Sequence, residues 1–286
     1  MNGFYNVLKS TSMTSSDVVV ILRGILRRIT GERLKVGHLG TLDPGGAGVL
    51  PIAVGSAVKL FDYMLSHVKV YRAEFVFGLT TDTLDSYGAV TDRGAQVTDP
   101  DEVILAARSL VGTYGQIPPL YSAKSVDGQR AYDLARKGVD VALKPREVTV
   151  YDIALVSHDG NRFTFDITCS AGTYIRSLAR DMAAKLGTVG YMSYIIRMRS
   201  GDFTLEGAAT LDEIKKDIDS GFCPLERFAA TLEDIAIPED KRAAVQNGVV
   251  YPITGEEKVL RRIVIGGVPY AVGTIEAGRL KVICKL

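Results

Sequence analysis

The sequence predicts an α+β fold with a central mixed or mostly antiparallel sheet flanked by helices, followed by a small β-rich C-terminal region. Three patterns predict this class. Residues 18–29 repeat apolar side chains at intervals of three and four, which is the period of an amphipathic helix. Residues 71–77 alternate apolar with mostly polar side chains, which is the period of a half-buried strand. Residues 148–169 contain two such strands around Asp159-Gly160, which is typical of an antiparallel hairpin.

The first helix should begin at Ser15 or Ser16, because a serine hydroxyl can cap a helix and Asp17 is favourable in the first turn. The glycine-rich residues 35–50 come next and include Asp43-Pro44. A residue before proline avoids the helical region, so this segment is expected to be a loop between apolar flanks. The strand after it, over residues 68–77, places Tyr71 on its inner face.

Two helices are expected between this strand and the hairpin. Pro100 opens the first, which should stop at Gly112, and the second should cover residues 129–137 and end at Gly138. The intervening segment, residues 116–121, contains two prolines and is expected to be irregular.

After the hairpin, a helix is predicted from Thr173 to a stop at Gly187, and residues 191–198 form a strand. Residues 211–229 are acidic and helix-like. From about residue 238 onward, short strands with Gly267, Gly273 and Gly278 at their ends indicate a small β-rich domain. We therefore predict two domains, residues 1–235 and residues 236–286.

Length and composition predict a stable globular protein, since 286 residues with 47% hydrophobic side chains can build a substantial core. The longest apolar stretches are far shorter than the roughly 20 residues of a membrane helix, so no membrane span is expected. The N-terminal residues do not resemble a secretory signal, and a cytoplasmic location is expected. The three cysteines are far apart and form no CxxC motif, so we predict reduced, buried thiols and no metal site.

Charge is unevenly distributed along the chain. The net charge of +1 does not suit a nucleic-acid-binding protein, but residues 201–250 hold eleven acidic and five basic side chains, a local balance of −6. Basic residues concentrate in four segments, residues 23–35, 124–146, 176–199 and 258–285. These segments could hold a polyanion that the acidic stretch repels; alternatively, most of the charges lie on solvated faces.

Four residues attract attention, although each has an ordinary structural interpretation. Asp43 precedes Pro-Gly-Gly, which is a common turn sequence. His38 could be a local hydrogen-bonding residue of a glycine-rich loop. Tyr71 would by default be a core residue, and Arg176, near a helix start, would by default be solvated. None of the four indicates chemistry by itself.

The sequence around these four residues does indicate chemistry. The ten contiguous residues Lys35 to Pro44, with Gly48-Val49-Leu50 after them, resemble the signature of the tRNA pseudouridine synthase B (TruB) family. Four further blocks follow in the order of that family: Lys69 to Tyr71, Gln116 to Lys124, Gly128 to Tyr132, and Cys169 to Leu178. The resemblance covers residues 1–235 and continues more weakly to the C-terminus.

This resemblance implies the pseudouridine synthase fold and an isomerase that converts uridine-55 in the tRNA T-loop to pseudouridine. Asp43 matches the catalytic aspartate of the family, and Arg176 matches an arginine that pairs with it and orients it. The reaction breaks the N1 to C1′ bond, rotates the uracil and rejoins it through C5. Because nothing is oxidised or added, an ionised and correctly aimed carboxylate is sufficient, and no cofactor is expected.

The same resemblance implies a substrate pocket. His38 should meet the RNA loop as the target uridine is extruded, and Tyr71 should stack on the flipped base. Tyr174 and Ile195 match pocket positions. Flipping costs a few kcal/mol, which stacking and phosphate contacts would return. Three routes stay open, namely addition to C6, attack at C1′ and elimination to a glycal, with Tyr71 a candidate for proton transfer.

The expected partner is the tRNA T-arm stem-loop, bound by a monomer without a protein partner. Residues 236–286 are expected to form a short PUA-like RNA-binding domain that touches the acceptor end of tRNA. One departure precedes the first helix, where Lys9 to Met13 replace an Asp-Lys-Pro-x-Gly run found in many members.

The sequence leaves two alternative functions to consider. A tRNA folding chaperone of the same fold, with catalysis secondary, would use the same pocket. A mononucleotide enzyme would use the glycine-rich loop for phosphate, but the sequence has neither GxxxxGK[ST] nor a strand-linked GxGxxG.

Overall fold

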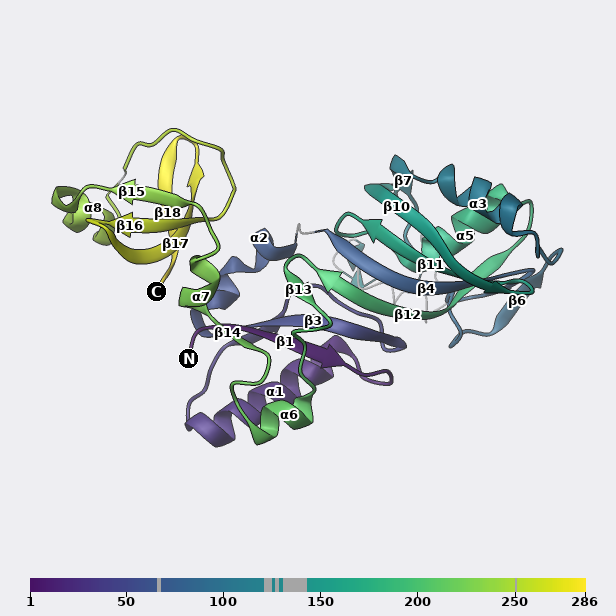
Figure 1. Ribbon diagram of the computed structural model, residues 1–286, viewed down its shortest axis with the longest axis horizontal. Helices are drawn as coiled ribbons and strands as arrows, with labels where there is room; N and C mark the ends of the chain where they lie inside the picture. The colour runs from purple at the N-terminus through teal and green to yellow at the C-terminus, as the bar shows by residue number, and fades with distance from the viewer. Residues whose placement is uncertain (66–67, 121–124, 127–128, 131–142, 250) are drawn as a thin grey trace. The chain divides into compact units, whose positions relative to one another are not determined.

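The structure, a computed structural model, describes residues 1–65, 68–120, 125–126, 129–130, 143–249 and 251–286. Packing divides the chain into two compact units (Figure 1). Unit 1 comprises residues 1–44, 48–67 and 201–286, and unit 2 comprises residues 45–47 and 68–200. These packing units differ in their limits from the predicted domains, residues 1–235 and 236–286, which remain a prediction.

The first sheet of unit 1 is built around β1 (Gly3–Lys9). This strand pairs antiparallel with β14 (Phe222–Pro224) on one side and with β3 (Gly46–Val54) on the other. A short strand, β2 (Val36–His38), pairs antiparallel with β3. Almost every residue of β1 and β3 is buried, because these strands lie in the interior of the unit.

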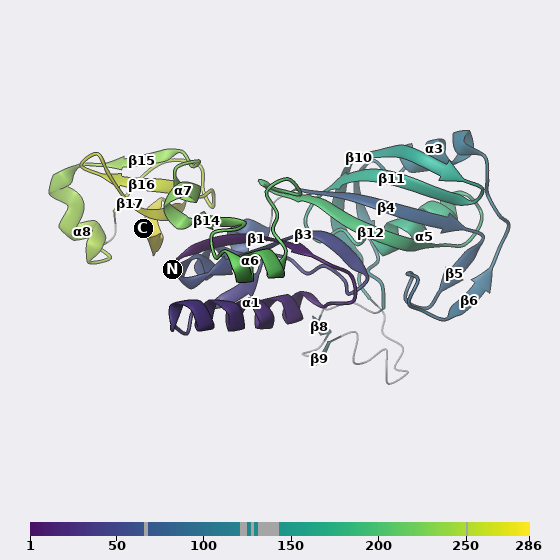
Figure 2. The same cartoon turned by 60° about the horizontal axis from the view of Figure 1, so that its bottom comes forward.

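The long helix α1 (Ser15–Thr30) confirms the predicted helix but not its cap. Thr14 caps it instead: its hydroxyl accepts from the backbone N–H of Asp17, whose carboxylate accepts from the N–H of Thr14. This reciprocal pair satisfies two N–H groups, so the serine hydroxyls are not needed there. Gly31 ends the helix at φ 73°, a left-handed conformation that suits glycine. Figure 2 shows α1 beside α6 (Leu211–Lys216) under β1.

The acidic segment over residues 211–229 is not one helix. It consists of α6, then β14, then α7 (Leu225–Ala229). Gly221, at φ 68°, separates them, and a Cβ there would lie 2.9 Å from the carbonyl oxygen of Asn6. Because this glycine lies close to β1, the chain here forms a strand at the edge of the sheet instead of continuing as a helix. The helical periodicity of the segment did not predict this strand.

The C-terminal part of unit 1 is the predicted small β-rich region. Its sheet has the order β15 (Asp234–Ile237), β16 (Arg261–Ile265), β17 (Val268–Glu276) and β18 (Arg279–Lys285), with only the first pair parallel. Gly267 and Gly278 lie at strand ends as expected, but Gly273 lies inside β17. A Cβ on Gly273 would come 2.5 Å from the carbonyl oxygen of Lys281, so glycine permits this pairing.

Unit 2 is an antiparallel sheet with helices on one face. The strand order is β12 (Gly190–Ser200), β4 (Lys69–Phe77), β11 (Arg162–Cys169), β10 (Arg146–Asp159) and β7 (Gly112–Gln116). α5 (Ile175–Lys185) packs on β12 and β4, and α3 (Pro100–Arg108) packs on β10 and on α5. The predicted strands, the hairpin and these two helices are confirmed.

The remaining elements are short: a 3-10 helix at Gly55–Leu60, α2 (Phe61–Leu65), β5 (Leu79–Thr81), β6 (Val90–Arg93), β8 (Ser125–Val126), β9 (Gln129–Arg130), β13 (Phe203–Thr204), a 3-10 helix at Glu239–Lys241, and α8 (Arg242–Gln246). The helix expected over residues 129–137 falls outside the described residues except at β9, which is a strand. Cys169 and Cys284 are buried free thiols, whereas Cys223 is half-buried. Among the described helices, none is long and apolar enough to cross a membrane.

Candidate active site

The loop predicted over residues 35–50 is shorter in the structure, because β2 and β3 take up both of its ends, and Asp43 lies in the remaining residues 39–45. Asp43 is partly buried, and Leu42 just before it is buried. The chain passes from unit 1 to unit 2 directly after Pro44. Gly45, the first residue there, lies against Tyr87, and a Cβ on it would clash with that ring.

Backbone groups on both sides of Asp43 are held by residues from elsewhere in unit 1. The Ser15 hydroxyl donates to the carbonyl oxygen of Leu42 and accepts from its N–H, both at 2.9 Å. The carbonyl oxygen of Pro44 accepts from the N–H of Ser12 at 2.9 Å and from Nζ of Lys9 at 3.4 Å. The loop is thus fixed immediately before and after its aspartate.

His38 is the last residue of β2, where it pairs with Ile52 of β3. The next residue, Leu39, donates its N–H to the carbonyl oxygen of Pro51 at 2.8 Å and is buried in the core. His38 and Asp43 therefore belong to the same unit, at the two ends of the short segment that continues from β2 into the loop.

Tyr71 and Ile195 share one face of the sheet in unit 2. Tyr71 on β4 pairs with Arg197 on β12, and Ile195 pairs with Ala73, so the four side chains point the same way. Phe77, six residues after Tyr71, also lies on this face. A Cβ on Gly190 would meet both Phe77 and Ala183 of α5, so this is the face that α5 covers.

The opposite face carries partly exposed charged side chains. It carries the ion pairs Arg72 to Asp166 at 2.7 Å and Arg162 to Glu74 at 2.8 Å. The burial of Tyr71, at 9% exposure, therefore follows from its place on the covered face, as its alternation predicted.

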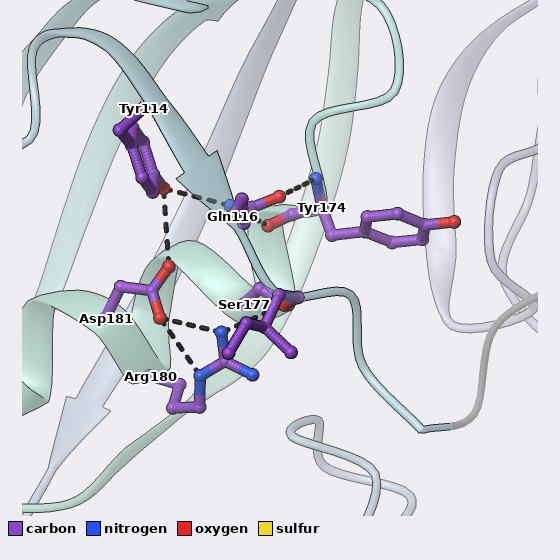
Figure 3. A network of polar contacts seen from close by, with 7 residues as sticks. Tyr114, Gln116, Tyr174, Ser177, Arg180 and Asp181 are labelled. Carbon is purple, nitrogen blue, oxygen red and sulfur yellow. Dashed lines mark hydrogen bonds and ion pairs between the residues drawn. The ribbon is translucent and has the colours of Figure 1, made fainter. Parts of the chain in front are cut away.

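Tyr174 precedes α5, and a buried glutamine holds its backbone (Figure 3). Oε1 of Gln116 accepts from the N–H of Tyr174 at 2.8 Å, and Nε2 donates to the Tyr174 carbonyl oxygen at 3.2 Å. Nε2 also donates to the Tyr114 hydroxyl at 3.0 Å, which in turn donates to Asp181 at 3.3 Å. In Figure 3 the Tyr174 ring extends away from this network.

The same network joins β7 to α5. The Ser177 hydroxyl and Nη2 of Arg180 both donate to the Ile117 carbonyl oxygen, each at 2.9 Å (Figure 3). Burial, with a smaller contribution from the charge of Asp181, raises the pKa of Tyr114 well above its usual value. The tyrosine thus remains a neutral hydroxyl that can both accept from Gln116 and donate to Asp181.

Arg176 is buried in the first turn of α5, which contradicts the default interpretation of a solvated side chain. Its Nη1 donates to the carbonyl oxygen of Thr83 at 3.0 Å and lies 3.7 Å from the Asp85 carboxylate. Both partners belong to the segment between β5 and β6, so tertiary contacts rather than helix position bury this guanidinium.

The predicted site residues thus form two groups, His38 with Asp43 in unit 1, and Tyr71, Tyr174, Arg176 and Ile195 in unit 2. The pairing of Arg176 with Asp43 and the individual roles remain predictions. No role in the site was predicted for Ser15, Lys9, Gln116 or Asp85, and Ser15 was predicted only as a possible helix cap. Gln116 could have been noticed, because it opens one of the family-like blocks. In the part of the chain that the structure describes, no group of three or more His, Cys, Asp or Glu side chains could hold a metal ion.

Residues 27–175 match the family model described as "TruB family pseudouridylate synthase (N terminal domain)", and this match spans more than half of the chain. The chain belongs to the TruB family. Pseudouridylate synthases of this family are isomerases, so the predicted enzyme class is confirmed. The TruB match contains His38, Asp43, Tyr71 and Tyr174, whereas Arg176 directly follows its last residue and Ile195 lies further along the chain.

Relatives named tRNA pseudouridine synthase B support the TruB assignment. The protein of Alkaliphilus oremlandii is 42% identical over 240 residues, covering 84% of this chain and 75% of the relative. That of Caldanaerobacter subterraneus subsp. tengcongensis is 45% identical over 218 residues, covering 76% and 75%.

Solved structures support the fold of this TruB-family chain. A chain of the crystal structure of a Cbf5-Nop10-Gar1 complex matches with a TM-score of 0.73 at 25% identity, covering 99% of this chain and 84% of that one. A chain of an H/ACA RNP bound to a substrate RNA containing 2′-deoxyuridine matches with a TM-score of 0.70 at 23% identity, covering 99% and 83%. The predicted α+β pseudouridine synthase fold is confirmed.

Proposed function

We propose that this TruB-family protein isomerises uridine-55 in the T-loop of tRNA to pseudouridine, with Asp43 as the nucleophile. The observation that carries the proposal is the Lys35 to Pro44 run, which lies inside the family match and contains the aspartate. The names of the relatives support tRNA as the substrate. The fixed backbone on both sides of Asp43 suits a group that must be aimed.

Each of the other site residues has a proposed task. Tyr71 and Ile195, neighbours on the helix-covered face of unit 2, would receive the flipped uracil, with Tyr71 stacking on the ring. Tyr174 would line the same pocket, oriented by Gln116. Arg176 would pair with the Asp43 carboxylate while Asp85 and Thr83 hold its guanidinium.

His38 would contact the RNA loop as the base leaves the stack. The Asp43 carboxylate then acts on the nucleotide, at C6, at C1′ or through a glycal. In each route the N1 to C1′ bond breaks and a C5 to C1′ bond forms, while C5 loses a proton and N1 gains one, so that the product is an isomer of uridine. Tyr71 is the candidate for moving the proton from C5.

We further propose that the enzyme works in the cytoplasm as a monomer on the T-arm stem-loop of tRNA, without a cofactor or a protein partner. Residues 236–286 would serve as a short PUA-like domain that touches the acceptor end of the same tRNA. Basic side chains in the four concentrated segments would contact phosphates.

The test is to incubate an unmodified tRNA transcript with the purified protein alone and to map pseudouridine by mass spectrometry. We expect one pseudouridine, at position 55, and none in a transcript with cytidine there. An isolated T-arm hairpin should also be converted. Asp43→Asn should abolish conversion and retain tRNA binding, whereas Asp62→Asn, an exposed aspartate of unit 1, should convert normally.

Three outcomes would contradict the proposal. Conversion by Asp43→Asn at the wild-type rate would remove Asp43 as nucleophile. Equal rescue of tRNA folding by wild type and Asp43→Asn, with no pseudouridine in either reaction, would favour a folding chaperone. Turnover of free UMP would indicate a mononucleotide enzyme.

A further inference from the structure

The two residues that flank Asp43 have their backbone groups held by side chains distant in sequence. The Ser15 hydroxyl makes hydrogen bonds to both backbone groups of Leu42, and Nζ of Lys9 donates a hydrogen bond to the carbonyl oxygen of Pro44. All of these residues belong to unit 1. The geometry therefore points to contacts whose common effect is the position of Asp43.

Ser15 uses its hydroxyl entirely on this loop. Thr14 caps α1, so the Ser15 hydroxyl is available for another contact. A hydroxyl has one proton to donate and lone pairs to accept with, and Ser15 applies both to Leu42. Ser15 is 2% exposed and Leu42 is 4% exposed, so water cannot easily substitute for these bonds.

Lys9 is an unusual component of a protein interior. At 1% exposure it is among the most buried side chains of the chain, and a lysine is rarely buried without polar partners. Its Nζ donates to the carbonyl oxygens of Ser10 at 2.9 Å and Pro44 at 3.4 Å.

We propose that Ser15 and Lys9 are positioning residues for Asp43, acting through the backbone of Leu42 and Pro44. This inference rests on the proposed function of Asp43. Peptide units fixed on both sides restrict the rotation of Asp43 about its own backbone, so the direction of its Cα–Cβ bond is set before substrate arrives. Such restriction contributes to the rate because a displacement of about 1 Å can cost about a hundredfold.

The test compares Ser15→Ala with Ser16→Ala. Ser16 is the adjacent serine in the same helical turn, and it is exposed. Single-turnover conversion of a tRNA transcript gives the rate constant, and a binding titration gives the Kd. We expect Ser15→Ala to lower the rate constant at least about tenfold with a Kd within about threefold of wild type. Ser16→Ala should match wild type in both.

Rescue and a second site extend the test. Ser15→Thr, which keeps the hydroxyl, should recover most of the rate. Lys9→Met, which keeps the length of the side chain and removes the ammonium, should lower the rate constant without changing the Kd. Because both residues act on one aspartate, we expect the double variant to lose less than the product of the two single losses.

Folding and function are separated by expressing each rate per folded molecule, with the folded fraction measured by circular dichroism. If Ser15→Ala does not fold, Ser15→Cys, with a weaker donor of similar size, should show an intermediate rate. Wild-type rates in folded Ser15→Ala and Lys9→Met, or a loss confined to the Kd, would overturn the inference. An inactive Asp43→Asn beside fully active Ser15 and Lys9 variants would refute the inference alone, whereas an active Asp43→Asn would refute the proposed function.

Discussion

Replacing Gln116 with alanine should weaken both the fold of unit 2 and the conversion of RNA. The Gln116 amide is 1% exposed and makes three hydrogen bonds, two to the Tyr174 backbone and one to the Tyr114 hydroxyl. Gln116→Ala removes all three and leaves the backbone groups of a residue proposed to line the substrate pocket without their partner. Tyr174 should then sample other orientations at the start of α5.

The magnitude follows from the number of bonds. A typical intramolecular hydrogen bond contributes about 0.5–1.5 kcal/mol net, so three contribute about 1.5–4.5 kcal/mol. A loss of about 3 kcal/mol lowers the Tm of a protein of this size by about 6–12 °C. Gln96→Ala, at an exposed glutamine of the same unit, should change the Tm by less than about 1 °C.

A second variant, Gln116→Glu, keeps the acceptor for the Tyr174 N–H but turns an ionised oxygen toward the Tyr174 carbonyl oxygen. Burial and this repulsion favour the protonated acid, so the folded-state pKa should exceed the unfolded value of about 4.3. Between those two pKa values the folded state binds more protons. The stability of Gln116→Glu should therefore fall as pH rises through this window, relative to wild type.

Thermal unfolding followed by circular dichroism measures the Tm, and single-turnover conversion at a temperature where all variants are folded measures activity. We expect Gln116→Ala to convert RNA about tenfold more slowly than wild type. A Tm within 2 °C of wild type would refute the energetic argument. A large fall in Tm with an unchanged rate would show that the orientation of Tyr174 does not limit conversion.

Three further predictions follow from other contacts. Asp85→Asn removes the carboxylate 3.7 Å from the buried Arg176 and should slow single-turnover conversion about tenfold or more, whereas Asp82→Asn, at an exposed aspartate, should not. Gly172→Ala should lower stability by about 1–2 kcal/mol from its φ of 80°, because the exposed Arg146 guanidinium near its Cβ can move aside at little cost. Gly187→Ala, with φ 68° and no atom near its Cβ, isolates the backbone contribution in the same unfolding assay. Burial, then the charge of Arg197, lowers the pKa of Lys69 from 10.5 to about 8. Between these two pKa values the unfolded chain binds a proton that the folded protein lacks, so Lys69 makes the free energy of unfolding rise with pH. Unfolding measured at pH 8 and pH 10 should therefore show a smaller rise in the free energy of unfolding for Lys69→Met than for wild type.

Elements with a long regular pattern were predictable because local side-chain periodicity and burial agree in them. The helix at residues 15–30, the strand with Tyr71 and the hairpin around Gly160 are of this kind. The segment over residues 211–229 was not predictable in this way, since a close approach between Gly221 and Asn6 decides its conformation.

The candidate site likewise contains residues that local sequence could predict and residues that it could not. Asp43 could be selected because a contiguous run of residues surrounds it, and that run resembles a family signature. The residues that hold the site could not, because their partners lie far away in sequence. Ser15 bonds a residue 27 positions later, Gln116 one 58 positions later, and Arg176 one 93 positions earlier. Local sequence gives no measure of such contacts.

The hydrophobic core of unit 1 has a consequence for how this protein should be shortened. Phe4 and Leu39 share one buried cluster with Leu260, Val272 and Cys284, which come from the C-terminal sheet and the segment before it. Removing the last fifty residues would therefore strip apolar neighbours from Leu39, the residue that directly follows His38. A truncated enzyme with weak activity would report a damaged interior as much as a lost RNA contact. Point substitutions on the outer surface of the C-terminal sheet are thus the sounder way to ask what that sheet does for tRNA.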